Sequence, residues 1–133
     1  MNDVPVDPEV QALAGRVFDA ARAGDAATLA TYVDAGVHVN LTNENGDTLV
    51  MLASYHGHPQ AVQVLIDRGA DVDRLNDKGQ SPLAGALFKG EDDVVRALVA
   101  GGASATIGQP TAVDAARMFG REDLLELLEP KPE

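Results

Sequence analysis

The sequence predicts an all-α protein, a solenoid of helix-turn-helix units joined by β-hairpin-like finger loops, with about four repeats and degenerate terminal caps. The main observation is a fixed spacing: Gly24, Gly57 and Gly90 are separated by 57−24 = 33 and 90−57 = 33 residues. Further pairs recur at the same offset, namely Gly46 and Gly79, Leu65 and Leu98, and Gly69 and Gly102. Such a period is typical of repeats that bury their apolar faces only against their neighbours.

The stretch 43–75 is the most complete copy of the repeat. Its motif residues are Gly46-Asp47-Thr48, Ala53, Gly57-His58, Val62, Leu65-Ile66 and Gly69-Ala70-Asp71-Val72; the next copy has Ser81-Pro82-Leu83, Ala86, Gly90, Val94-Val95, Leu98-Val99 and Gly102-Ala103. These residues resemble the ankyrin repeat, G-x-T-P-L-H-x-A-A-x-x-G-H-x-x-V-V-x-x-L-L-x-x-G-A-D-V-N. The resemblance implies an ankyrin-repeat solenoid that binds another protein on a concave face, formed by the inner-helix ends and the fingers.

Length and composition fit one domain spanning residues 1–133, because 45% hydrophobic and 23% charged residues are an ordinary globular balance. We divide it into a first repeat and N-cap at 8–42, repeat two at 43–75, repeat three at 76–107, and a fourth repeat and C-cap at 108–129. The last residues, 130–133, are expected to form a frayed tail, because two prolines prevent the helix from continuing.

The charge balance limits the possible partners. A formal net charge of −11 and a pI near 4.5 oppose binding to a phosphate backbone, so we expect no nucleic-acid partner and favour a protein with a basic or amphipathic patch. The chain has no cysteine, and its start lacks a basic region followed by an apolar run. No stretch has the roughly 18 apolar residues of a membrane span. We therefore expect a soluble, cytoplasmic protein with no membrane partner, a monomer or else a homo-oligomer.

The first repeat begins with a good helix entry, Asp7-Pro8-Glu9, in which Asp7 can cap the first free amides. An apolar stripe at helical spacing follows and should end before Gly24; its members are Val10, Leu13, Ala14, Val17, Phe18 and Ala21. Asp25 can cap a second helix that ends before Gly36, with Leu29, Tyr32 and Val33 facing inward.

The two central repeats share one plan. Thr48 and Ser81 are expected N-caps of the inner helices, and Pro59 is expected at the first position of an outer helix that ends before Gly69. The fingers preceding the inner helices should turn at Asn43–Gly46 and Asn76–Gly79, which have typical turn compositions.

The fourth repeat departs from the period, because Gly90 and Gly120 are separated by 120−90 = 30 residues. The shortening falls at Ile107–Pro110, which replaces a full finger. The outer helix is expected at Glu122–Leu128, with Glu129 where the earlier repeats have Ile66 and Val99. A shorter finger and a polar outer residue suit a C-terminal cap.

The histidine of the T-P-L-H motif is missing from all four copies. Phe18, Met51, Ala84 and Asp114 stand in its place, so the inter-repeat hydrogen bonds that the resemblance implies at this position cannot form. The apolar replacements can be buried without polar partners, and we expect the fold to survive.

No residue pattern predicts an enzyme. His56 and His58 could share a metal across Gly57, but His58 occupies the G-H position of the repeat, where a capping or packing role is the stronger interpretation. The carboxylates Asp71 and Asp73 belong to the G-A-D-V-N turn, and Glu91-Asp92-Asp93 complement a helix dipole. We therefore predict no catalytic residue, no metal site and no cofactor.

A stripe of large side chains is the candidate partner-binding site. Tyr55, Phe88 and Met118 occupy one position at the ends of successive inner helices, where they either face a partner or fill gaps between helices. The complete set of predicted partner-binding residues is Arg22, Glu44, Asn45, Asp47, Tyr55, His56, Asp77, Lys78, Gln80, Phe88, Lys89, Met118 and Phe119. The favoured function is therefore an adaptor, regulator or inhibitor. A self-associating structural subunit is the main alternative, and a small metal-dependent enzyme or sensor is a third.

Overall fold

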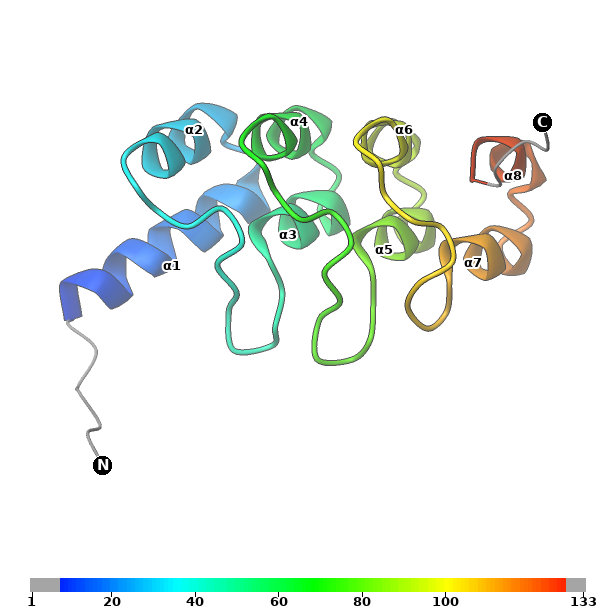
Figure 1. Cartoon of the computed structure of the whole chain (residues 1–133), viewed down its shortest axis with the longest axis horizontal. Coiled ribbons are helices and arrows are strands. Elements are labelled where there is room, and N and C mark those ends of the chain that lie inside the picture. The colour runs from blue at the N-terminus through cyan, green and yellow to red at the C-terminus, as the bar shows by residue number, and fades with distance from the viewer. Residues whose placement is uncertain (1–7, 129–133) are drawn as a thin grey trace.

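The computed structural model describes residues 8–128, which form two layers of helices (Figure 1). The inner layer contains α1 (Pro8–Ala23), α3 (Leu49–Tyr55), α5 (Pro82–Lys89) and α7 (Ala112–Met118). The outer layer contains α2 (Ala26–Asp34), α4 (Pro59–Asp67), α6 (Asp92–Ala100) and α8 (Glu122–Leu128). Each inner helix is followed by the outer helix that packs on it, and the pairs stack side by side. This arrangement confirms the predicted all-α solenoid.

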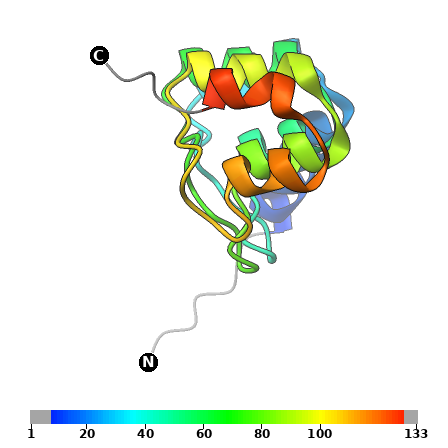
Figure 2. The ribbon, with the colours of Figure 1, turned by 90° about the vertical axis from the view of Figure 1, so that its right-hand side faces the viewer.

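The loops between successive helix pairs extend from the stack as fingers. In the view along the stack, the fingers project away from both helical layers, and the inner helices lie to one side of them (Figure 2). The fingers and the inner helices therefore meet at an angle. We call the surface inside this angle the concave face. Within the described residues the only strand-like pairing is a single antiparallel bridge between Thr42 and Thr48, which closes the base of one finger.

Four of the described helices begin at a side-chain cap, and three of these caps are predicted ones. Asp25, Thr48 and Ser81 each accept a hydrogen bond from the backbone amide three residues later, at 3.1 Å, and Thr111 does the same for α7. The predicted cap at Asp7 lies outside the described residues. These short polar contacts are local in sequence, which is why the helix boundaries can be read from the chain.

The core lies between the two helical layers. Leu29, Leu65 and Leu98 of the outer helices are fully buried against inner-helix residues such as Leu49 and Leu83. The predicted inward residues Tyr32 and Val33 are partly buried and pack against this core, as do Ile66 and Val99 of the later outer helices. Between Pro8 and Leu128 no helix combines the length and the apolar composition that a membrane crossing requires.

The apolar side chains that replace the motif histidine are buried, as predicted. Phe18, Met51 and Ala84 are buried, whereas Asp114 is exposed. Polar contacts between repeats are nevertheless present, because the loops supply them. Asn40 Oδ1 accepts from the Asp71 amide at 2.8 Å, and Asp73 Oδ1 accepts from the Ser104 amide at 2.7 Å. The loops thus link neighbouring repeats without the motif histidine.

The prediction that His58 caps or packs locally needs correction. His58 stands at the N-cap of α4 but makes no side-chain cap hydrogen bond. Its Nε2 instead donates to the carbonyl oxygen of Arg22, 2.8 Å away at the end of α1. Sequence alone could not find this contact, because the two residues are 36 positions apart.

The short fourth finger packs on the finger before it. The Gln109 amide donates to the Gly79 carbonyl at 2.9 Å, and a side chain at Gly108 would lie against the same carbonyl and Leu75. The predicted outer helix Glu122–Leu128 has the same bounds as α8. The expectations for Glu129 and for the tail 130–133 lie outside the described residues.

Candidate partner-binding surface

The last turns of three inner helices present large side chains to the concave face. Tyr55 ends α3, Phe88 lies one residue before the end of α5, and Met118 ends α7. Their exposed fractions are 38%, 61% and 68%, so these side chains do not fill gaps in the core. The repeat therefore brings them to one surface, as the sequence predicts.

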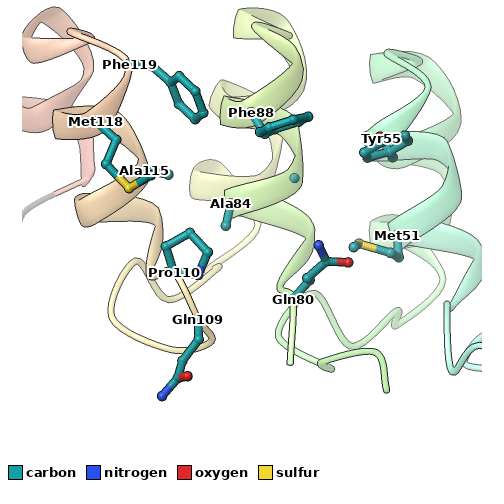
Figure 3. Close-up of a pocket in the computed structure, with 11 residues that line it drawn as sticks. Met51, Tyr55, Gln80, Ala84, Phe88, Gln109, Pro110, Ala115, Met118 and Phe119 are labelled. Carbon is teal, nitrogen blue, oxygen red and sulfur yellow. The ribbon is translucent and has the colours of Figure 1, made fainter. Parts of the chain in front are cut away.

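These side chains line an open pocket of about 360 Å³ between α3, α5, α7 and the short finger (Figure 3). Phe119, which follows α7 and is 44% exposed, lies in the same wall. Among the described residues six large hydrophobic side chains are exposed, and four of them are Tyr55, Phe88, Met118 and Phe119. Exposed apolar groups thus gather at one place on the molecule instead of being scattered over it.

Contacts between neighbouring rings hold the wall in shape. The rings of Phe88 and Phe119 meet edge to face with centroids 5.5 Å apart. The Lys89 ammonium lies 5.0 Å from the centroid of the Tyr55 ring, on which His56 also packs edge-on at 5.6 Å. The aromatic side chains are therefore oriented by contacts within the chain itself.

The floor of the pocket is built by residues that are not among the predicted partner-binding residues. Met51, Ala84 and Ala115 lie four positions before Tyr55, Phe88 and Phe119 (55−51 = 88−84 = 119−115 = 4), one helical turn away on the same face. Gly85 adds space beside Met51, and Gln109 and Pro110 of the short finger close the side. Helical spacing could have found the floor, but not the finger residues.

A second pocket, of about 320 Å³, lies next to the first, between the fingers of repeats two and three. Its predicted members are Asn45, Asp47, Tyr55, Asp77, Lys78 and Gln80, and Met51, Leu52 and Asn76 complete it. The two pockets share Met51, Tyr55 and Gln80, so they adjoin along these residues, and we call the two together the groove.

Asn76, which the sequence predicts only as a turn residue, shapes the polar half of this groove. Its Oδ1 accepts from the amides of Lys78 and Gln80, both at 3.0 Å. Its Nδ2 donates to Asp47 Oδ1 at 2.9 Å and to Gln80 Oε1 at 2.8 Å, so it joins two neighbouring fingers.

Comparison with known proteins agrees with this architecture. A sequence profile of ankyrin repeats, in three copies, matches residues 17–109. The chain belongs to the ankyrin-repeat family. This chain is 42% identical over 67 residues to a Pseudomonas aeruginosa protein named as the ankyrin repeat protein PA3287. The match covers 48% of this chain and 39% of that protein.

Among solved structures, the crystal structure of the human ASB11 ankyrin repeat domain is similar, with a TM-score of 0.73. It is 28% identical in sequence, and the match covers 84% of this chain and 52% of that one. The matched regions therefore span about half or less of each relative. Ankyrin repeats generally act as protein–protein interaction modules, usually as scaffolds without catalysis.

Four predicted residues of this ankyrin chain lie outside the two pockets. Arg22 forms an ion pair with Asp19 at 3.0 Å, and Glu44 is at a finger tip. His56 and Lys89 stand at the edge of the aromatic wall. Partial burial, followed by the nearby charges of His58, Arg22 and Lys89, lowers the pKa of His56, so its neutral form is favoured.

The described residues bring few histidine and carboxylate side chains close to one another. Within residues 8–128 no three histidine, aspartate or glutamate side chains lie close enough together to hold a metal ion. The Nε2 of His58 is engaged with α1. Asp73 bonds to the next repeat, in keeping with the structural role predicted for it.

Proposed function

We propose that this ankyrin-repeat chain binds a partner protein through its concave face and acts as an adaptor, regulator or inhibitor of that partner. The observation that carries the proposal is the gathering of four exposed large apolar side chains in one pocket. Apolar surface of this kind is favoured where a partner will cover it.

The choice of side chains supports the same conclusion. The chain has only two tyrosines and three phenylalanines, and three of these five residues, Tyr55, Phe88 and Phe119, line the pocket. Aromatic residues are enriched among those that contribute most to binding energy, because they bury a large rigid surface with little loss of conformational entropy.

The acidic fingers favour a partner with a basic or amphipathic patch. Glu44, Asp47 and Asp77 lie on the two long fingers beside the apolar pocket, on a chain with a formal net charge of −11. Charges at such a rim mainly increase the association rate and make it sensitive to salt. We therefore assign recognition to the apolar wall and electrostatic steering to the fingers.

The test is an affinity capture from a lysate of the cells that produce the protein, with wild type beside a Tyr55→Ala/Phe88→Ala variant. The double variant should lose the specific partner, because each anchor contributes roughly 2 kcal/mol. Leu127→Ala, an exposed leucine of α8 away from the concave face, is the matched control. Circular dichroism of all three proteins is the check that each variant is folded.

A partner that is retained equally by the wild type and the double variant would show that recognition uses another surface. The mass of the pure protein across a dilution series separates partner binding from self-association. A dimer that is abolished by the double variant would favour the self-associating subunit over the adaptor.

A further inference from the structure

The groove on the concave face has two chemically different halves that meet at shared residues. One half is lined mostly by carbon, with Phe88, Phe119 and Met118 around a floor of alanines. The other half lies between the fingers and contains amide and carboxylate groups. Because Tyr55 and Gln80 line both halves, a single segment can occupy the two at once.

The carboxylates of the polar half lack a full set of partners within the described residues. Asp77 accepts no side-chain hydrogen bond and enters no ion pair there, and its carboxylate lies over Gly46. Asp47 Oδ1 accepts one hydrogen bond, from the neutral amide of Asn76. Lys78 supplies one positive charge to this half against two negative charges. The polar half is therefore short of a cation.

Two carboxylates of the outer helices, in contrast, are each held by an arginine of the next repeat. Arg68 binds both carboxylate oxygens of Asp34, at 2.9 and 3.1 Å, and Arg121 binds both oxygens of Asp92, at 2.9 and 2.8 Å. The chain thus pairs carboxylates between repeats on its outer layer, whereas Asp47 and Asp77 on the fingers have no arginine partner.

We propose that the groove binds a flexible segment of the partner in which a large apolar side chain stands beside a lysine or arginine. The apolar side chain fills the pocket between α5 and α7, and the cation reaches Asp47 and Asp77. This inference rests on the proposed function and specifies what the concave face recognises. Charge complementarity selects the occupant, since a purely apolar segment would leave both carboxylates without a cation.

The test begins with a selection of short random peptides displayed on phage against the wild-type chain. Enriched peptides should share a large apolar residue with a lysine or arginine next to it or one residue away. A parallel selection against Phe88→Ala/Met118→Ala should enrich none of them. Enrichment of sequences without a basic residue, or no enrichment at all, would overturn the inference.

The second step is a double-mutant cycle with one enriched peptide and single substitutions in the chain. Phe88→Ala should raise the Kd about thirtyfold, and Asp77→Asn about threefold. Changing the basic residue of the peptide to methionine should remove the effect of Asp77→Asn but not that of Phe88→Ala. Leu127→Ala and Glu126→Gln on α8 are the matched controls and should leave the Kd unchanged.

The cycle also separates this inference from the proposed function. If Asp77→Asn raises the Kd of the methionine peptide as much as that of the original peptide, the carboxylate of Asp77 does not bind the cation of the peptide. The inference then fails. The concave face still stands as the binding surface in that case, provided that Phe88→Ala weakens both peptides. If Phe88→Ala also has no effect, the inference and the proposed function fail together.

Discussion

At the scale of single residues, the turn between α1 and α2 shows how one contact can join two repeats. Gly24 has a φ of 74°, which favours glycine, and His58 of the next repeat packs directly over it. A methyl group at Gly24 would collide with the imidazole ring and displace the hydrogen bond from His58 Nε2 to Arg22. The absence of a side chain at this position therefore serves both the turn and the packing between repeats.

We expect Gly24→Ala to lower the free energy of unfolding by about 2 kcal/mol, from backbone strain together with the lost hydrogen bond. Gly90→Ala is the matched control, because Gly90 has a φ of 71° but no atom near the position of a side chain. It should cost about 1 kcal/mol, from strain alone. Urea unfolding measures both, and equal costs would mean that the His58 contact does not contribute.

At the scale of elements, salt bridges connect outer helices across the repeats. Asp92 begins α6 and was expected only to complement the helix dipole; its carboxylate also holds Arg121, at the start of α8, through two hydrogen bonds. Hydrogen bonds from this guanidinium lower the pKa of Asp92, and Arg68 does the same for Asp34. The final helix is thus tied to the preceding repeat by charge as well as by Leu124 and Leu128 in the core.

The lowered pKa of Asp92 predicts a dependence of stability on pH. The folded state holds its proton less tightly than the unfolded chain, whose aspartate pKa is near 3.8. The stabilisation is therefore present above this pH and is lost as the pH falls below it. Asp92→Asn should be less stable than wild type at neutral pH and should lose less stability on acidification, as measured by urea unfolding. Parallel pH curves for the two proteins would contradict this role.

At the scale of the whole molecule, the linear stack makes stability depend on neighbours. The pairs α3–α4 and α5–α6 each pack between two others, whereas the end pairs α1–α2 and α7–α8 each have one described neighbour (Figure 1). Local opening should therefore be easier at the two ends of the described stack than at its centre, and easiest in α8, which touches its neighbouring outer helix least. Binding through a pocket that spans α3, α5 and α7 would join the C-terminal end to the centre.

Amide hydrogen exchange followed by mass spectrometry should show the fastest exchange in α8 and the slowest in α3 and α5. Asp92→Asn should speed exchange in α8 more than in α2, because only α8 loses its salt bridge to α6. Equal protection of α8 and α5 would show that the stack opens as one cooperative unit. An equal change in α2 and α8 would mean that the substitution acts on the whole fold.

The repeat, the helix boundaries and the aromatic stripe could all be predicted from the order of residues. Caps such as Thr48 reach only three residues along the chain, and a glycine such as Gly90 acts on its own backbone torsion, so these features are visible without any partner. The contacts between repeats became visible only in the folded chain: the pocket wall at Pro110, the contact of His58 with α1, and the pairing of Arg121 with Asp92. These partners lie about one repeat or more apart in the chain, and only the packing of one helix pair on the next sets the distance and direction between them.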